Sequence, residues 1–348
     1  MPERTLTRRE LNRALLARQL LLERASLPLP RAVERIAGIQ DQYAPNAYLR
    51  LWSCLDGFER EALDRALVRR SVVQGTLMRG TIHVVARSDY ALFAAGIRRA
   101  GQEWWRRVNR IPAELDMEPI ARRAREFLAG TTRTRAEVED FLRASDFRRT
   151  TPWGFSHWVD LVRVPPAGTW GRRRADLFAL AEEWVGPLDA REEDGLEHLV
   201  RRYLAAFGPA PRTDIASWAG LKPAHLAATL ERMTLRRFRD EAGNELLDLP
   251  RAPLPDPDLP APVRFLPTWD AALLVHARRT GILPEEYRPV IFSTKIPPSM
   301  PTFLVDGSVA GSWRYEGGKI ELTPFRRLDR AVLRELRDET ERLAAFHA

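Results

Sequence analysis

The chain has 348 residues, 45% of them hydrophobic and 29% charged, with 55 Lys and Arg against 47 Asp and Glu and a net charge of +8. This length allows roughly two to four small domains, and no apolar run approaches the roughly 20 residues that cross a bilayer. The N-terminal residues carry no secretion signal, and the single cysteine, Cys54, excludes an internal disulfide. We therefore expect a cytoplasmic protein without membrane contact.

The basic residues are almost all arginines. Only Lys222, Lys295 and Lys319 are lysines, so 55 − 3 leaves 52 arginines. A GC-rich coding sequence accounts for most of that ratio, but the net positive sign is a separate property. It favours a polyanionic partner, because Lys and Arg displace counterions from phosphates.

The first segment predicts three helices and a hairpin. Leucines recur at helical spacing over residues 6–22, and Pro30 opens a second helix that reaches Gln40. A third helix is expected around residues 60–70. The stretch 71–85 is rich in β-branched residues and predicts a two-stranded wing.

The second segment, about residues 116–184, repeats this plan. Thr134 and Glu137 form a capping box that opens a helix, and a further helix is expected after residues 151–154. Residues 161–170 read as strand, turn and strand.

The third segment shows the plan most clearly. Thr213 or Asp214 is expected to cap the middle helix. A helix–turn–helix followed by a ribbon is a winged helix. The expected helices are 196–207, 215–219 and 224–233, and the expected wing strands are 235–239 and 245–249.

A proline-rich linker, residues 250–262, precedes short apolar strands and a closing helix. The strands are expected at 263–266, 290–293, 302–305, 308–315 and 319–322, and the helix at 329–346. The predicted fold class is therefore α+β, with three tandem winged-helix motifs and a small C-terminal β-rich domain. The predicted domains are 1–95, 96–190, 191–250 and 251–348.

Several motifs in this order resemble those of one family. They are the Gln40 and Gln42 pair, the wing 78–83, the helix-turn run 214–221, and the stretches 266–270 and 305–314. The chain resembles the AlkZ-like and YcaQ-like winged-helix DNA glycosylases over nearly its whole length. The resemblance implies a concave DNA-binding surface, removal of N7-alkylated purines and, in some members, unhooking of interstrand crosslinks.

Asp41, between the two glutamines, departs from the family pattern. The family usually carries an aliphatic or small residue there, and the YcaQ-like branch has a carboxylate in place of the second glutamine. Two interpretations stay open. Asp41 either faces away as a solvated helix-end residue or turns towards the substrate and supports the chemistry.

The resemblance implies that Gln40 and Gln42 are catalytic. An N7-alkylated purine is cationic and departs as a neutral base, so a strong general base is not essential. A neutral amide can orient water with its oxygen and bind phosphate or sugar with its NH₂. We expect Gln42 to position water and Gln40 to support it. The alternative is that both amides only satisfy the carbonyls of a helix end.

The wing supplies further candidates. Arg79, Thr81 and His83 alternate along the predicted strand, so they are expected on one face. The functional interpretation is that Arg79 and Thr81 bind DNA and that His83 lies near the lesion as a possible catalytic support. The alternative is a polar strand side that faces solvent.

Other cations and aromatics are candidates for DNA contact. They are Arg106 and Arg107 beside two tryptophans, Arg172 and Arg173 after the second wing, and Trp269 with Asp270 at the entry to the β domain. The alternatives are a linker helix packed through its tryptophans and a solvated charge run.

The leading interpretation is a monofunctional DNA glycosylase, because the three lysines lie far in sequence from the glutamine motif and a lyase needs an amine. We expect a monomer that acts on double-stranded DNA carrying alkylated purines, with possible self-resistance to a DNA-alkylating natural product. No metal-ligand spacing and no nucleotide-binding loop occurs, so no cofactor is expected. The alternatives are a non-enzymatic winged-helix transcriptional regulator and a scaffold that binds damage without cleaving it.

Overall fold

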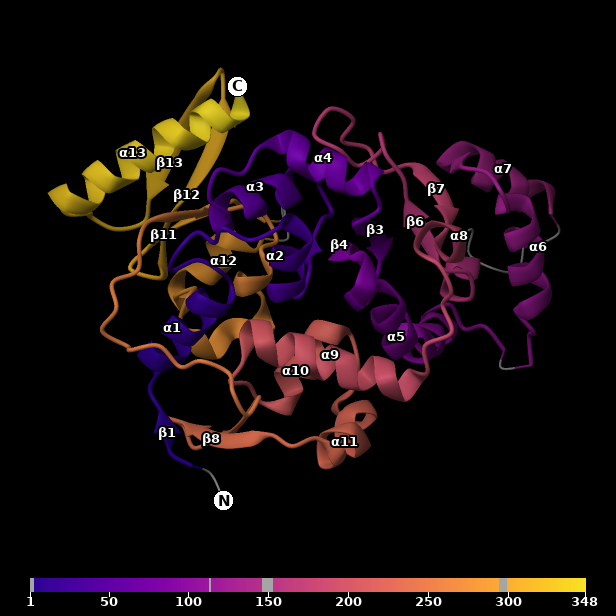
Figure 1. Cartoon of the computed structure of the whole chain (residues 1–348), viewed down its shortest axis with the longest axis horizontal. Helices are drawn as coiled ribbons and strands as arrows, with labels where there is room; N and C mark the ends of the chain where they lie inside the picture. The colour runs from indigo at the N-terminus through magenta and orange to yellow at the C-terminus, as the bar shows by residue number, and fades with distance from the viewer. Residues whose placement is uncertain (1–2, 113, 146–152, 294–298) are drawn as a thin grey trace.

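The computed structural model describes residues 3–112, 114–145, 153–293 and 299–348. The fold is mixed α+β, with helices around three separate sheets (Figure 1). The predicted α+β class is confirmed, while the count of three winged helices and the bounds of the four domains stay predictions.

The largest sheet has six strands in the order β2-β4-β3-β6-β7-β5. Strand β3 pairs with β6, so the two ribbons that the sequence predicted separately form one continuous sheet. Their bounds are β2 (Ile39–Gln40), β3 (Val72–Thr76), β4 (Ile82–Ala86), β5 (Arg133–Thr134), β6 (Leu161–Arg163) and β7 (Leu177–Leu180).

The first segment has four helices, which are α1 (Arg8–Arg18), α2 (Leu29–Arg35), α3 (Pro45–Cys54) and α4 (Arg60–Val68). Of these, α2, α3 and α4 pack on the β2–β4–β3 end of this sheet, while α1 packs against α9 (Glu192–Phe207). The predicted continuation of the second helix to Gln40 is wrong, because α2 ends at Arg35 and Gln40 lies in β2. Gly38 turns the chain with φ +81°, and a Cβ there would lie 2.9 Å from Val85 Cγ1.

The second segment supplies the far end of the molecule. Its helices are α6 (Glu118–Leu128), α7 (Arg135–Ala144) and α8 (Ala181–Val185), and the long helix α5 (Arg87–Val108) leads to them from β4. The predicted capping box of Thr134 and Glu137 opens α7 and is confirmed. Part of the predicted helix start at 151–154 lies outside the described residues, and the chain after it forms the 3₁₀ turn η2 (Gly154–His157).

The third segment has the predicted element order, and strand β1 (Thr5–Leu6) adds in parallel to its wing. The elements are α9 (Glu192–Phe207), α10 (Arg212–Ala219), α11 (Pro223–Arg232), β8 (Arg236–Asp240) and β9 (Glu245–Asp248). The predicted cap of α10 is wrong: Pro211 is its N-cap, and Asp214 forms an ion pair with Arg279.

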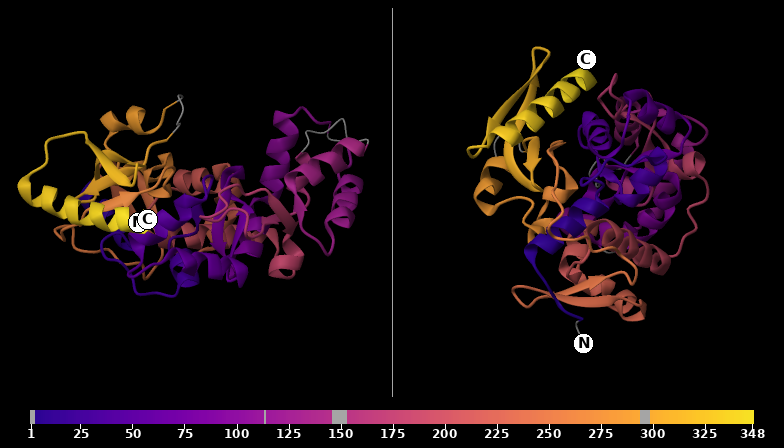
Figure 2. Two further views of the ribbon diagram at one scale, coloured as in Figure 1. Left: turned by 90° about the horizontal axis from the view of Figure 1, so that it is seen from above. Right: turned by 60° about the vertical axis from the view of Figure 1, so that its left-hand side comes forward.

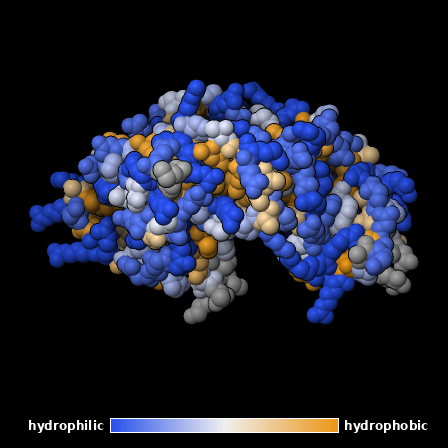
Figure 3. Space-filling view, turned by 90° about the horizontal axis from the view of Figure 1, so that it is seen from below, coloured by the Kyte–Doolittle hydropathy of each residue, from blue (hydrophilic) through white to orange (hydrophobic). Residues whose placement is uncertain are grey.

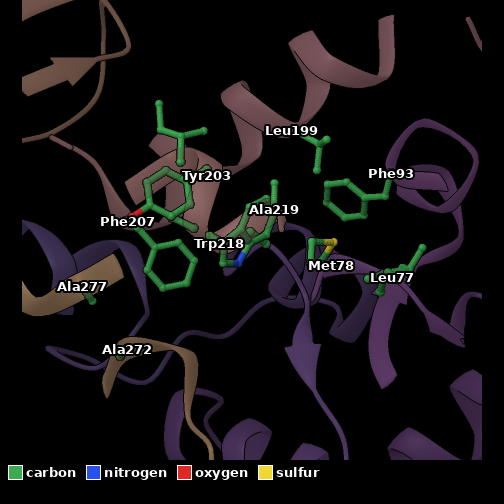
Figure 4. Packing of buried hydrophobic residues seen from close by; sticks show 14 of the residues in the cluster. Leu77, Met78, Phe93, Leu199, Tyr203, Phe207, Trp218, Ala219, Ala272 and Ala277 are labelled. Atoms are coloured by element: carbon green, nitrogen blue, oxygen red, sulfur yellow. The ribbon is translucent and has the colours of Figure 1, made fainter. Parts of the chain in front are cut away.

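Helix α9 runs through the main hydrophobic core, where Tyr203 and Phe207 surround Trp218 of α10 (Figure 4). Met78, from the tip of the β3–β4 hairpin, is buried in the same cluster. Trp218 is therefore a core residue, and the hairpin tip is fixed against α10.

The C-terminal part is a four-stranded antiparallel sheet covered by a helix (Figure 1). Its elements are β10 (Arg264–Leu266), β11 (Thr302–Val305), β12 (Ser308–Glu316), β13 (Lys319–Pro324) and α13 (Arg330–His347). The predicted strand at 290–293 is wrong, because α12 (Arg288–Ile291) occupies it and only Phe292 forms a bridge, to Ser299.

The whole molecule is an arch. The α6–α7 end and the orange segment around α12 project to the same side (Figure 2). A space-filling view from below shows the hollow between these two ends (Figure 3). Strands β4, β3, β6 and β7 lie between them (Figure 1).

Candidate active site

Gln40 is fixed at the edge of the six-stranded sheet. It pairs in register with His83 of β4 and is 8% exposed. Its Oε1 accepts a hydrogen bond from Arg79 Nη2 at 2.6 Å. Within the described residues its Nε2 has no partner, so the NH₂ group is the part of this amide that remains able to bind a substrate.

Arg79 holds that amide from a strained turn. It lies in η1 (Met78–Gly80) with φ 57°, and its Nη1 donates to the carbonyl of Trp218. Among the described residues it forms no ion pair with a carboxylate. Burial lowers the pKa of Arg79 to about 10, so the guanidinium stays charged at neutral pH.

Gln42 differs from Gln40 in being exposed. Its Oε1 accepts a hydrogen bond from the backbone N–H of Ile82 at 3.1 Å. A carbonyl oxygen has two lone pairs, so this oxygen can accept a second hydrogen bond, for example from water. The pair therefore projects one nearly buried amide and one accessible amide from a rigid strand end.

His83 is buried, with 2% of its surface exposed. Its Nδ1 lies 3.0 Å from the carbonyl oxygen of Thr81, which can only accept, so Nδ1 carries the hydrogen. Burial, with the nearby charge of Arg79, lowers the pKa of His83 to about 3. At physiological pH the ring is neutral and cannot serve as an imidazolium acid.

Arg79, Thr81 and His83 lie on one side of the hairpin, since Thr81 Oγ1 is 3.5 Å from His83 Nδ1 and Arg79 bonds to Gln40, the register partner of His83. The alternative of a polar strand side that faces solvent is wrong, because His83 is buried and the other two are half-buried. The η1 turn interrupts the strand, and both Arg79 and His83 point into the protein. Thr81 is half-buried, and its hydroxyl donates to the carbonyl of Met78 at 3.0 Å. The DNA-binding role given to Arg79 and Thr81 stays a prediction.

Asp41 is not the solvated residue that one interpretation expected, because only 2% of it is exposed. Its Oδ1 accepts from the N–H of Ala47 at 3.2 Å, and its Oδ2 accepts from Gln74 Nε2. Burial raises the pKa of Asp41 to about 8, against the opposing effect of these two hydrogen bonds and of Arg163. Asp41 is thus a buried carboxyl group with specific partners.

Gln74 connects the glutamine segment to the loop after β6. Its Nε2 also donates to the carbonyl of Gly168 at 3.0 Å. That loop carries Arg173, whose Nη1 donates to the hydroxyl of Tyr43 at 2.6 Å. The exposed guanidinium of Arg173 is therefore hydrogen-bonded to the exposed side chain of Tyr43, the residue that follows Gln42, although Arg173 is far from both in sequence.

The remaining predicted DNA contacts are divided between surface and interior. Arg107 is exposed, and Arg172 is exposed with an ion pair to Asp176 at 2.8 Å. Arg106 donates at 3.0 Å to the carbonyls of Pro112 and Leu115.

Trp269 and Asp270 are held by the fold. Trp269 donates its backbone N–H to Ser299 Oγ at 3.1 Å, and its ring packs against Phe292. Asp270 is 5% exposed and pairs with Arg50 Nε at 3.0 Å. The contacts of these residues are internal, and their predicted role at DNA stays a prediction.

Sequence reasoning missed Tyr43, Gln74 and Arg163. Tyr43 directly follows the glutamine motif, which was the available signal. Gln74 and Arg163 are polar residues inside strands of apolar neighbours, a pattern that marks a buried polar contact or a site. The register β3–β6 that places them opposite each other was not visible in the sequence.

The described part of the chain lacks two kinds of feature. None of its helices is long and apolar enough to cross a membrane. It also holds no group of three or more His, Cys, Asp or Glu residues placed to bind a metal ion.

Comparison with known proteins identifies relatives over almost the whole chain. The sequence model of the family described as DNA glycosylase AlkZ-like matches residues 33–346. A Streptomyces sahachiroi protein named interstrand DNA cross-link repair glycosylase is 22% identical over 94% of this chain and 93% of its own length. The solved structure of S. sahachiroi DNA glycosylase AlkZ matches with a TM-score of 0.80 and 20% identity, over 98% of this chain and 96% of that one.

Proposed function

The chain belongs to the AlkZ-like DNA glycosylase family, and on that premise we propose that it is a monofunctional glycosylase that excises N7-alkylated or bulky-adduct purines from double-stranded DNA. The observation that carries the proposal is the pair of amides, Gln40 and Gln42, held by a rigid strand end and a charged arginine. Unhooking of interstrand crosslinks belongs to the same proposal and is supported by the name of the relative. Self-resistance to a DNA-alkylating natural product is part of the proposal that this name does not address.

The two amides divide the chemistry. The C1′–N9 bond of the cationic nucleoside breaks, and its electron pair neutralises the departing base. Gln42 Oε1 accepts a hydrogen bond from a water and directs that water at C1′ of the resulting oxocarbenium-like sugar. The water that has bonded to C1′ carries a positive charge and is strongly acidic, so it readily loses a proton to solvent.

Gln40 supports this step with its NH₂ group. Because Arg79 occupies its oxygen at 2.6 Å, the free N–H bonds point to the sugar or to a phosphate oxygen. A charged donor on the amide oxygen withdraws electron density and strengthens those N–H donors. Neither buried His83 nor Arg79 has to exchange a proton in this scheme.

The hollow side of the arch is the proposed DNA surface. Exposed Arg173 and Tyr43 beside Gln42 fit a phosphate and a base edge, and the net charge of +8 favours a polyanion. Among the described lysines, Lys222 caps α11 and Lys319 lies in β13, so neither belongs to an element of the site. This placement supports a glycosylase without lyase activity.

The test is base release. The protein is incubated with duplex DNA carrying 7-methylguanine or a nitrogen-mustard crosslink, and free base and abasic sites are measured. We expect excision by the wild type and a loss of about 100-fold or more in single-turnover rate for Gln42→Ala, since the water is no longer held.

Duplex affinity of Gln42→Ala is expected to stay near that of the wild type. Absence of any released base, together with one preferred palindromic sequence, would instead identify a transcriptional regulator. Tight binding to damaged DNA without release would identify a damage-binding scaffold.

A further inference from the structure

A pocket of about 200 Å³ opens on the sheet next to the glutamine segment. It lies at strands β3, β6 and β7, between the sheet and the η2 turn. Polar and cationic groups form much of its wall, among them Thr76, Arg135, Trp153, Ser156, Asp160 and Arg163.

The strand register places this pocket close to Gln42. Gln42 Oε1 is bonded to the N–H of Ile82, and Ile82 lies directly opposite Thr76 in the β3–β4 pair. Thr76 Oγ1 in turn accepts from Arg163 Nη1 at 3.0 Å. Because adjacent strands are about 4.8 Å apart, the pocket begins roughly one strand spacing from the backbone that holds Gln42.

Arg163 is the unusual member of this wall. It is half-buried, it forms no ion pair among the described residues, and its Nε is buried without a hydrogen-bond partner. Burial lowers the pKa of Arg163 to about 10, so the charge persists at neutral pH. A partly desolvated cation without an ion-pair partner is costly, and an anionic ligand in the pocket would offset that cost.

The other charged groups at the pocket do not provide this counter-charge. Asp160 is paired with Arg98 at 2.7 Å, and Arg135 with Glu139 at 2.8 Å. The carboxyl of Asp41 lies on the same sheet face, bonded to Gln74, the residue opposite Arg163. With a pKa raised to about 8 by burial, Asp41 is largely neutral at physiological pH.

We propose that this pocket binds one DNA phosphodiester beside the lesion, with Arg163 as its principal ligand and Thr76 and Arg135 as further donors. This inference rests on the proposed function. Arg163 Nη1 donates to Thr76, and Nη2, which has no partner among the described residues, is the donor that remains for a phosphate oxygen, to which a planar guanidinium is well suited. The Thr76 oxygen already accepts from Arg163, so its hydrogen is available to donate.

The apolar part of the wall completes the fit. The guanidinium of Arg163 lies 5.4 Å from the ring centre of Phe178, and that of Arg135 lies 5.2 Å from Trp153. These rings fix both cations and leave an apolar surface for the deoxyribose of the bound nucleotide. A phosphate anchored here fixes the position of the DNA strand relative to Gln42. Arg163 is therefore a residue that positions the DNA.

The first test is the salt dependence of binding to an undamaged duplex. Each phosphate contact contributes about 0.9 to the slope of log K against log salt concentration. We expect Arg163→Gln to reduce the magnitude of that slope by about one. Arg334→Gln on exposed α13 removes the same charge far from the sheet and is expected to leave the slope unchanged.

A folded Arg163→Gln with the wild-type slope would overturn the proposal. Its melting temperature is measured first, and if it does not fold, Arg135→Gln and Thr76→Val replace it. Both keep Arg163, and each is expected to weaken duplex binding. If both bind as the wild type does, the pocket is not a phosphate site.

The second test locates the phosphate. A single neutral methylphosphonate is moved along the strand of a duplex carrying one 7-methylguanine. The wild type is expected to lose about tenfold or more in affinity at one position near the lesion, and Arg163→Gln to lose nothing further at that position. Equal losses in both proteins would overturn the assignment. If no base is released but Arg163→Gln reduces the salt dependence of duplex binding, the proposed function is refuted and the phosphate pocket still stands.

Discussion

At the scale of single residues, the site is built on polar groups that the fold removes from water. Gln40 and Asp41 are adjacent in sequence, yet they point to opposite faces of the sheet, since side chains alternate along a strand. Gln40 meets Arg79 on one face, and Asp41 meets Gln74 on the other. Each face therefore contributes one buried contact that fixes the backbone before Gln42.

The raised pKa of Asp41, about 8 against an ordinary 3.8, makes stability depend on pH. Between these values the unfolded chain releases the proton and the folded protein retains it, so stability falls as pH rises from about 4 to 8. We expect Asp41→Asn, which has no such titration, to gain about 1 to 3 kcal/mol relative to the wild type on going from pH 5 to pH 8. Urea unfolding at both pH values measures this difference.

One result of the Asp41→Asn comparison would contradict the raised pKa of Asp41. If the difference in unfolding free energy between the two proteins is the same at pH 5 and pH 8, Asp41 is ionised in the folded state at both. Asp41→Leu, which resembles the usual family residue, removes the partner of Gln74 and shows how far excision depends on that contact.

At the scale of elements, the junction of β3 with β6 brings two distant loops together. Gln74 and Arg163 are opposite each other in this pairing. Gln74 donates to both Asp41 and the carbonyl of Gly168, so it joins residues 40–42 to the loop after β6. Arg173 of the same loop donates to the hydroxyl of Tyr43. The second segment therefore supplies one wall of a site whose amides come from the first.

Gly168 is the point where this loop has no room for a side chain. Its φ is +73°, and a Cβ would lie 2.3 Å from Gln74 Oε1. We expect Gly168→Ala to destabilise the protein by about 1 to 3 kcal/mol and to lower the excision rate, because Gln74 must move away from Asp41. Thermal unfolding and single-turnover excision measure the two effects.

Gly130 is the matched control. It has φ +65°, and a Cβ there meets nothing within 4 Å, so Gly130→Ala carries backbone strain without the clash. Equal destabilisation by both substitutions, with equal excision rates, would show that the contact of Gly168 with Gln74 has no influence on the site.

At the scale of the whole molecule, the N-terminal residues of the chain hold the third segment in place. Strand β1 adds to the β8–β9 wing, as Figure 1 shows for β1 and β8. Arg18 of α1 forms a two-pronged ion pair with Asp248 of β9, with both distances 2.8 Å. Contacts of β1 and α1 therefore hold the β8–β9 wing of the third segment, which lies more than 200 residues away in sequence.

The Arg18–Asp248 pair is almost wholly buried, with side-chain exposures of 1% and 0%. Removing one partner leaves an uncompensated charge in the interior. We expect Asp248→Asn to cost about 3 to 5 kcal/mol of unfolding free energy. Chemical denaturation measures this cost. The exposed pair of Arg237 and Glu245 on the same wing is the control, and Glu245→Gln is expected to change stability by less than about 1 kcal/mol.

Local signals in the sequence were sufficient for most elements. The capping box at Thr134, the helix at residues 329–346 and the strands at 302–305, 308–315 and 319–322 were predicted because each depends on a few neighbouring residues. Among the wrong predictions, the helix reaching Gln40 arose where a tertiary contact outweighed local preference. Gly38 is such a case, because the close approach of Val85 decides its turn.

The sequence by itself determined the class of fold, the positive charge and the paired amides, because composition, periodicity and short motifs are properties of the chain alone. Only the tertiary structure decided that two separately predicted ribbons share one sheet, that Asp41 is buried and that Arg163 has no ion-pair partner among the described residues. Strand register and the solvation of a polar group depend on residues distant in sequence, and these distant neighbours set both the pKa values and the free hydrogen-bond donors of the site.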